Sequence, residues 1–310
     1  MTASVADVSA AEVFAVRTPL PVNEIVQTTK GSYVRLGEEL FRLDACETPE
    51  GVCLSSAPLD NGPIDAPDGA LPDGKVALAD DGDIRNAWFD RPTSRYRHGV
   101  LGDAIEGGSL KIVTERGTRH EFVLPENQVF EDITPRIRDL DGDGRNEVIA
   151  IRASQTGGAA LALYGMRDGE LTELAVSSEN GRPNRWLNVA GIVEGGAGGP
   201  AAVYAVRTPH IGGRLFSITW DGTRLVEEND IATDLSNHVI GSRDLGLSAV
   251  GDFGGGEEIV LPSQDRKRLR FPLSDRPDID LTLVVDKAIV LIEGRIVTAS
   301  EDGLLLVVVP

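Results

Sequence analysis

One short segment of the chain carries carboxylates at a spacing that suits a hard cation. It reads Asp139-Leu-Asp141-Gly-Asp143-Gly-Arg145-Asn-Glu147. Carboxylates at the first, third and fifth positions converge when the backbone curls, and a glycine at position six permits the tight turn. The carbonyl of the seventh residue adds an uncharged oxygen, and the final glutamate closes the coordination sphere. The segment therefore predicts a calcium site formed by Asp139, Asp141, Asp143, Arg145 and Glu147.

The same segment does not fit the helix–loop–helix calcium motif. That motif needs a bidentate glutamate at position twelve and a helix on each side of the loop. Here position twelve is Ala150, and the apolar run Val148–Ile151 reads as a strand. A loop between two strands is expected instead, and an Asp/Gly turn that binds no ion stays open as the alternative.

The strands expected to position this loop belong to a unit that repeats along the chain. Ala150-Ile-Arg152, four residues and Gly157-Gly158 recur as Ala205-Val-Arg207, four residues and Gly212-Gly213. Each copy continues into an apolar run and an Asp-Gly turn, which is typical of a β-hairpin. Apolar strand centres lie near Val76, Ile112, Val148, Val203, Ile259 and Ile296, and Tyr33–Leu43 supplies a seventh unit. This spacing indicates four-stranded blades plus loops, with little helix.

The Asp139–Glu147 pattern resembles the strand–loop–strand calcium loops of FG-GAP/VCBS repeats, familiar from integrin α-subunit propellers. From about Leu71 to Val309 the chain is similar to bacterial proteins that carry such repeats. The resemblance implies an all-β fold, a seven-bladed β-propeller of four-stranded antiparallel blades, with six or eight blades as alternatives. It implies no reaction. Pairing of Leu304–Val309 with an N-terminal strand would close the ring and remove an exposed edge.

This fold predicts one domain. Residues 1–30 are expected to form a partly irregular extension, and 31–310 the propeller, with a Pro/Gly-rich loop at 54–74. Three other loops keep turn glycines but lose most carboxylates: Gly102–Gly108, Val193–Gly199 and Gly251–Glu258. We expect tight turns there, and whether ions bind near Asp103, Glu194 or the pair Asp252 and Glu257 stays open.

A second candidate site is expected on the face opposite the calcium loop. In a propeller, the turn between the first two strands of a blade opens on one face, and entry loops and the next turn open on the other. Three of the four histidines map to the second face, with His98 placed before the first strand of a blade. The candidate ligand-binding residues are His98, Trp186, Asn188, His210, His238 and Arg243. A structural role, a transition-metal site and an axial pocket remain alternatives, whereas His120 reads as a structural residue within a strand.

Composition limits the partners. The chain has 310 residues, with 49 acidic against 30 basic side chains and a formal charge of −19. Such a balance disfavours nucleic acid and anionic membranes, and no apolar run reaches the ~18 residues of a membrane helix. A protein or carbohydrate ligand is expected. Cys46 and Cys53 suit a small disulfide loop, which favours a periplasmic or extracellular protein, although residues 1–20 contain no intact signal peptide.

Signals for catalysis are weak. The chain lacks the serine-hydrolase elbow, the zinc-protease helix motif and a phosphate-binding loop. We therefore expect a calcium-stabilised recognition or scaffold protein. The alternative is a propeller hydrolase or lyase, acting on a polysaccharide or an ester, with its active site on the face of His98, His210 and His238.

Overall fold

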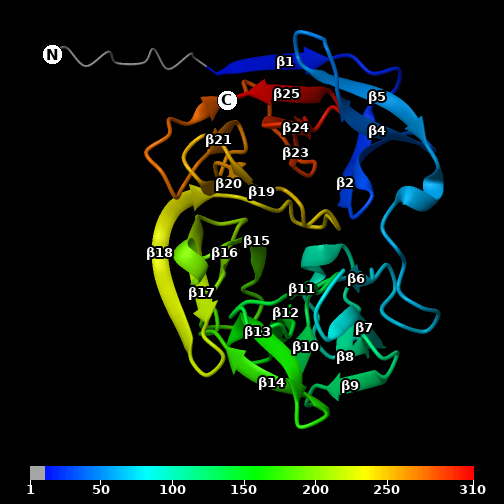
Figure 1. Cartoon of the computed structure of the whole chain (residues 1–310), viewed down its shortest axis with the longest axis vertical. Coiled ribbons are helices and arrows are strands. Elements are labelled where there is room, and N and C mark those ends of the chain that lie inside the picture. The colour runs from blue at the N-terminus through cyan, green and yellow to red at the C-terminus, as the bar shows by residue number, and fades with distance from the viewer. Residues whose placement is uncertain (1–10) are drawn as a thin grey trace, which may run out of the picture.

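Strands form almost all the regular structure of the chain. The computed structural model describes residues 11–310, in which sheets follow one another around a central axis (Figure 1). Three short 3-10 helices lie in loops: η1 (Leu59–Asn61), η2 (Gly99–Leu101) and η3 (Gly196–Gly198). Abundant glycine and short β-branched runs favour this pattern of brief strands and tight turns.

Four of the sheets are antiparallel and have four strands each. The first consists of β2 (Val22–Thr28), β3 (Gly31–Leu36), β4 (Glu39–Ala45) and β5 (Val52–Ala57). A later one consists of β15 (Leu187–Val193), β16 (Ala202–Arg207), β17 (Gly213–Trp220) and β18 (Leu225–Leu235). It is followed by β19 (Ala249–Asp252), β20 (Glu257–Pro262), β21 (Arg268–Arg270) and β22 (Ile279–Asp280). The last contains β23 (Val290–Ile292), β24 (Arg295–Ala299), β25 (Leu305–Val309) and β1 (Glu12–Val16).

The remaining sheet has nine strands and contains two four-stranded groups. One group is β6 (Ala77–Leu78), β7 (Ile84–Thr93), β8 (Glu106–Thr114) and β9 (Arg119–Val123). The other is β11 (Arg136–Arg138), β12 (Glu147–Ser154), β13 (Gly158–Arg167) and β14 (Glu170–Val176). Between them, β10 (Gln128–Phe130) pairs with both β8 and β12.

The N-terminal and C-terminal strands meet in the last sheet. β1 runs antiparallel to β25, with Glu12 opposite Val309 and Val16 opposite Leu305. Residues 11–30 contain two strands, β1 and β2, and each finds a partner in a different sheet. Residues 1–10 of the expected extension lie outside the described residues.

The expected count of seven blades is not confirmed. The described residues form six groups of four strands in a propeller-like arrangement. The difference arises because the apolar centres near Val76 and Ile112 belong to one group: β6 pairs with β7, and β7 pairs with β8. A spacing of about 35 residues therefore separated strands of the same sheet.

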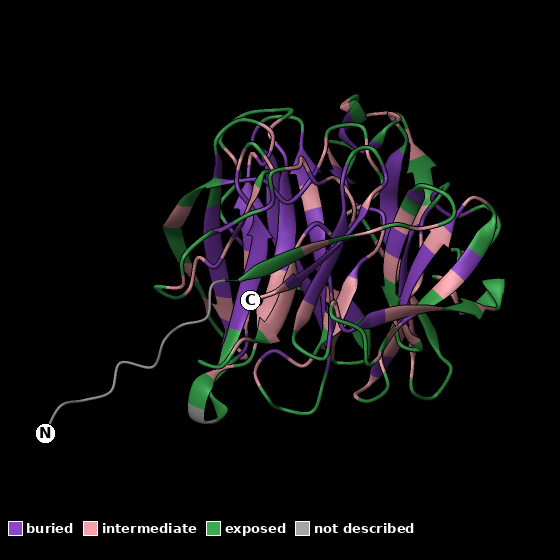
Figure 2. Ribbon diagram, turned by 90° about the horizontal axis from the view of Figure 1, so that it is seen from above, coloured by how far each residue is buried: buried purple, intermediate pink, exposed green. Residues whose placement is uncertain are grey.

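The core lies between the sheets. Figure 2 shows buried strands through the middle of the molecule and exposed loops at both ends. Most residues of β12 and β13 are buried on both faces, since a neighbouring sheet covers each side. One buried cluster joins Ile149 and Leu161 to Val203, Phe216 and Trp220 of the next sheet. Within the described chain, no helix is long and apolar enough to cross a membrane.

A disulfide between Cys46 and Cys53 joins the end of β4 to β5. It closes the loop predicted from the sequence, in which Gly51 adopts a positive φ of 72°. Disulfides of this kind are typical of proteins in oxidising compartments.

Candidate metal centre and axial cavity

Residues Asp139–Glu147, here called the acidic loop, form the turn between β11 and β12. Two of its glycines, Gly142 and Gly144, have φ values of 77° and 84°, a region that glycine enters without steric cost. Their amides donate to the two oxygens of Asp139, at 2.8 and 2.9 Å. These bonds curl the loop around the Asp139 carboxylate.

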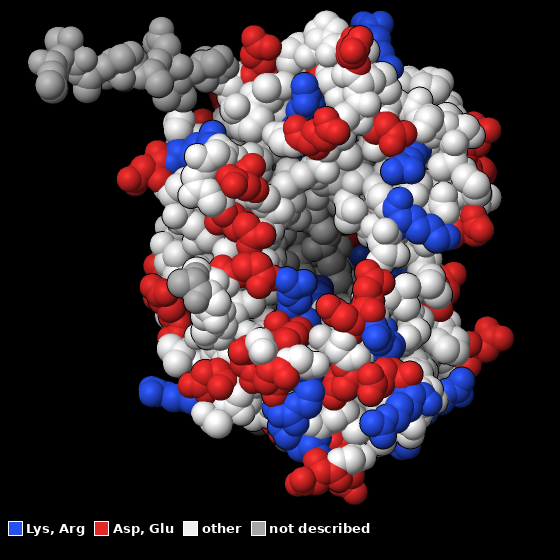
Figure 3. All heavy atoms as spheres, viewed as in Figure 1, with Lys and Arg blue, Asp and Glu red and all other residues white. Residues whose placement is uncertain are grey.

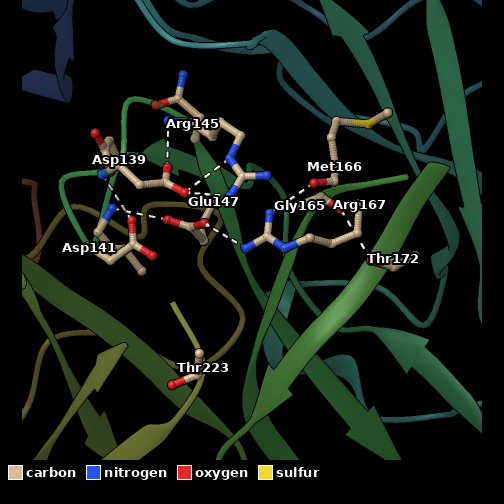
Figure 4. Close-up of polar contacts among 12 residues, drawn as sticks. Asp139, Asp141, Arg145, Glu147, Gly165, Met166, Arg167, Thr172 and Thr223 are labelled. Carbon is tan, nitrogen blue, oxygen red and sulfur yellow. Dashed lines mark hydrogen bonds and ion pairs between the residues drawn. The ribbon is translucent and has the colours of Figure 1, made fainter. Parts of the chain in front are cut away.

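Three carboxylates of this loop converge. Oxygens of Asp139, Asp141 and Glu147 all lie within 4.8 Å of one another (Figure 4). Across residues 11–310, no other set of three or more histidine, cysteine or acidic ligands comes this close together. Three anionic oxygens at this spacing fit a hard divalent cation.

Glu147 is the most unusual member of the cluster. Its side chain is fully buried, and Oε2 accepts a hydrogen bond from the Leu140 amide at 3.1 Å. The other oxygen, Oε1, has no hydrogen-bond partner. Burial raises the pKa of Glu147 to about 7, and the charges of Asp141 and Asp143 add to the effect. A buried carboxylate oxygen without a partner is costly, and a bound cation would satisfy it.

Asp143 does not join this cluster. Its Oδ2 accepts from Nε and Nη2 of Arg145, at 3.0 and 2.6 Å, and its Oδ1 accepts from the Arg145 amide. The sequence predicted Asp143 as a ligand, but here an adjacent guanidinium occupies it. This pair lies at the surface, where ion pairs are weak.

The degenerate loops carry ordinary turns. Asp252 accepts from the amides of Gly254, Gly255 and Gly256, which caps the β19–β20 turn. Glu257, which lies opposite Asp252 in the β19–β20 pair, accepts from the Glu194 amide.

The stretch Gly102–Gly108 is not the turn that we expected. It covers the end of the β7–β8 connection and the start of β8, whereas the turn between the first two strands of that group is 79–83. His98 lies in the same connection, between the second and third strands of the group, and not before a first strand as predicted. The β6 strand is only two residues long, and it carries too little apolar pattern to be recognised. Asp103 accepts from the Ile105 amide and from Arg243.

Two histidines contact Trp186, and a third is linked to it through Glu131. The His210 ring is stacked with the Trp186 ring at a centroid distance of 6.0 Å, and the His238 ring lies 4.6 Å from it. His210 Nε2 and His238 Nδ1 are 2.8 Å apart. Trp186 Nε1 donates to the backbone oxygen of Glu131, whose carboxyl contacts His98 Nδ1 at 2.5 Å.

The hydrogen bonds fix the tautomers of two of these rings. His238 Nε2 is 2.9 Å from the Ser242 carbonyl, which can only accept, so Nε2 carries the proton. His238 Nδ1 must then accept from His210 Nε2, which leaves a lone pair on His210 Nδ1. Burial lowers the pKa of His238 to about 3 and that of His210 to about 4, and nearby His98 contributes to the latter.

Other predicted residues of this face are used inside the protein. Trp186 and Asn188 are buried, and Asn188 donates to the carbonyls of Asn237 and Leu245. Arg243 contacts Asp73 and Asp103, at 2.9 and 2.6 Å.

The connections that hold the histidines and the acidic loop lie at opposite ends of the strands. His210 lies between β16 and β17, the second and third strands of a group, whereas the acidic loop lies between a first and a second strand. Successive antiparallel strands alternate in direction, so these two types of turn open at opposite ends.

A cavity of about 930 Å³ lies at the axis. Figure 3, which has the same view as Figure 1, shows a hollow at the centre of the molecule with acidic and basic side chains around it. Residues of β2, β6, β11 and β23 line the cavity together with the 239–248 segment. Among the predicted ligand-binding residues only Arg243 lines it, while Ser242, the partner of His238, connects its wall to the histidine cluster.

Sequence reasoning missed three charged residues near these sites. Glu131 is fully buried and its Oε2 has no partner, and burial raises its pKa well above the usual value. Burial, assisted by nearby Glu131, raises the pKa of Glu106 to about 9. Arg167 lies beside Glu147. The adjacent acids Glu131 and Asp132, inside the otherwise apolar stretch 129–133, were the available signal for the first of these.

Comparisons with known proteins give fold-level similarity only. No family model matches the chain, and no curated protein matches it. Among solved structures, a rhamnogalacturonan lyase from Bacillus licheniformis is 15% identical, with a TM-score of 0.47 over 92% of this chain and 66% of the lyase. The N-terminal domain of Nup159 is 11% identical, with a TM-score of 0.38 over 93% of this chain and 75% of that one. BamB from Moraxella catarrhalis is 11% identical, with a TM-score of 0.27 over 96% and 97%.

Proposed function

We propose that this protein is an exported, calcium-stabilised β-propeller that recognises a protein or carbohydrate ligand. The observation that carries the calcium assignment is the unpartnered Oε1 of Glu147, buried next to the carboxylates of Asp139 and Asp141. An all-oxygen, anionic ligand set favours calcium over softer metals. The ion would satisfy Glu147 and hold the β11–β12 turn in its curled form.

Recognition is assigned to the axial cavity. Its volume of about 930 Å³ lies in the range of small-molecule and oligosaccharide sites. Several of its charged side chains are paired: Lys287 contacts Asp286 at 2.6 Å, and Arg243 contacts Asp73. Paired charges offer both donors and acceptors without a large net field, which suits a polar, uncharged ligand such as a carbohydrate.

Direct calcium binding tests this proposal. Protein freed of metal by a chelator should bind about one calcium ion per chain in isothermal titration calorimetry. Asp141→Asn should abolish binding. Asp252→Asn, in the β19–β20 turn, is the matched control and should retain it. Failure of the unaltered protein to bind calcium at millimolar concentration would remove the metal from this account.

A second candidate function is a hydrolase or lyase that uses the histidine cluster. It is favoured by the orientation of His98 by the buried carboxyl of Glu131 and by the free lone pair on His210 Nδ1, since such groups serve in proton transfer. Turnover of a polysaccharide or ester that is lost in His98→Ala and kept in His120→Ala supports this candidate. Equal turnover by both variants contradicts it.

A further inference from the structure

Arg167 is the basic residue that contacts the most buried ligand of the acidic loop. It ends β13, and its Nη2 lies 3.9 Å from Oε1 of Glu147, the oxygen that has no hydrogen bond (Figure 4). At that distance the two groups attract each other without forming a hydrogen bond. Arg167 therefore leaves Oε1 of Glu147 without a hydrogen-bond donor.

A backbone hydrogen bond holds the other end of the Arg167 guanidinium in place. Nη1 donates to the Met166 carbonyl at 2.8 Å, and about a quarter of the side chain, 27%, is exposed. Arginine stays protonated under all ordinary conditions. A positive charge thus remains beside the carboxylate cluster whether or not an ion is bound.

The surroundings of Arg145 differ. Its guanidinium pairs with Asp143 at the surface, with 48% of the Arg145 side chain exposed, and water screens that charge. Glu147 is fully buried, so its interaction with Arg167 is screened less. Of these two arginines, Arg167 should have the larger effect on a bound ion.

We propose that Arg167 sets the calcium affinity of the loop by acting as a permanent internal counter-charge to Glu147. The inference rests on the proposed calcium site and deepens it. Without the ion, Arg167 stabilises the buried carboxylate. With the ion, the same charge repels calcium and offsets one of the negative charges that attract it. Calcium affinity in proteins is tuned by the charge of the ligand set.

The two effects have opposite signs, and this makes the proposal testable. Arg167→Gln should lower the melting temperature of the chelator-treated protein, because Glu147 loses its counter-charge. The same variant should bind calcium more tightly, by about tenfold. A residue that merely supported the fold would weaken both properties.

Calorimetric titration with calcium chloride measures the calcium affinity, and melting curves in chelator measure the stability of the metal-free protein. The titrations should be run in an alkaline buffer, in which protons compete little with calcium for the carboxylates. Arg167→Lys keeps the charge and should keep an affinity close to that of the unaltered protein. Arg152→Gln is the matched control: it breaks the pair with Glu173 in the same sheet and should change stability only.

The outcomes separate the two proposals. Absence of calcium binding by the unaltered protein contradicts the proposed function. Normal binding by the unaltered protein, with Arg167→Gln binding equally or less tightly, overturns the role of Arg167 alone. If Arg167→Gln does not fold, Arg167→Met, which keeps the aliphatic stem without the charge, replaces it.

Discussion

Gly222 contacts the carboxylate of Asp141 across the boundary between two groups of strands: a Cβ at Gly222 would lie 2.7 Å from Asp141 Oδ2. Asp141 belongs to the β11–β12 turn, and Gly222 to the β17–β18 turn. The candidate metal centre thus lies against the next sheet. An ion held there would stabilise the contact between the two sheets as well as its own loop.

Gly222→Ala should weaken calcium binding in addition to lowering the free energy of unfolding. Gly222 has a φ of 89°, and an alanine there costs about 1–2 kcal/mol of folding free energy. The Asp141 carboxylate must also move away, which spoils the ligand set. Gly169→Ala is the control, because Gly169 has a φ of 84° in the β13–β14 turn with nothing near its Cβ position.

Calorimetric titration and urea unfolding of the two glycine variants decide this. Both should lose similar stability in chelator, and only Gly222→Ala should bind calcium more weakly. Equal calcium affinity in the two variants would show that Asp141 does not need its observed position.

Replacing Cys46 and Cys53 by serine should lower the free energy of unfolding by about 2–3 kcal/mol. The closed loop is short, so the disulfide removes only limited entropy from the unfolded chain. Chemical unfolding of the double variant measures the loss. Mass spectrometry of alkylated, non-reduced protein must show the bond in the starting material, and two alkylated thiols there would contradict the disulfide.

Glu106 should make the protein less stable as pH rises from about 4.5 to about 9. Its pKa is about 9 in the folded protein, against 4.5 as the ordinary value, mainly because of burial. The folded protein therefore holds a proton in this window that the unfolded chain has released, which disfavours folding as pH rises. The loss is at most about 1.4 kcal/mol per pH unit.

Glu106→Gln mimics the protonated carboxyl and should reduce this loss. At about pH 8 the variant should exceed the unaltered protein in stability by about 1–3 kcal/mol, and below about pH 4.5 the two should agree. Urea unfolding across this range measures the slopes. Glu126→Gln, at a side chain that is 95% exposed, is the control. Identical slopes for Glu106→Gln and the unaltered protein would contradict the protonation of buried Glu106.

Local patterns made part of the fold predictable. The repeated phrases around Ala150 and Ala205 lie in β12 and β16, each the second strand of its group and each followed by the expected hairpin. Such hairpins depend on residues that are close in sequence. The pairing of Leu304–Val309 with an N-terminal strand was predicted from the exposed edge that it removes, and β25 pairs with β1. The grouping of the other strands was not predictable, because β10 pairs with strands on both sides, β8 and β12.

In the sites, too, contacts between residues close in sequence were predictable and contacts between distant residues were not. Asp139, Asp141 and Glu147 converge as the spacing predicts, because one turn holds all three. The contact of His98 with Glu131 joins residues 33 positions apart, and Trp186 reaches Glu131 over 55. No local pattern encodes these contacts. Asp143 was predicted as a ligand, but in the structure its carboxylate pairs with Arg145, only two residues away, and side-chain rotation decides between the two partners.

The melting temperature with and without calcium tests the central claim most directly. Calcium bound only by the folded protein should raise it by about 4–8 °C at a hundredfold excess over the dissociation constant. Asp141→Ala should abolish this rise, and Asp252→Asn should retain it. A melting temperature of the unaltered protein that is the same in chelator and in millimolar calcium would contradict a calcium-stabilised propeller.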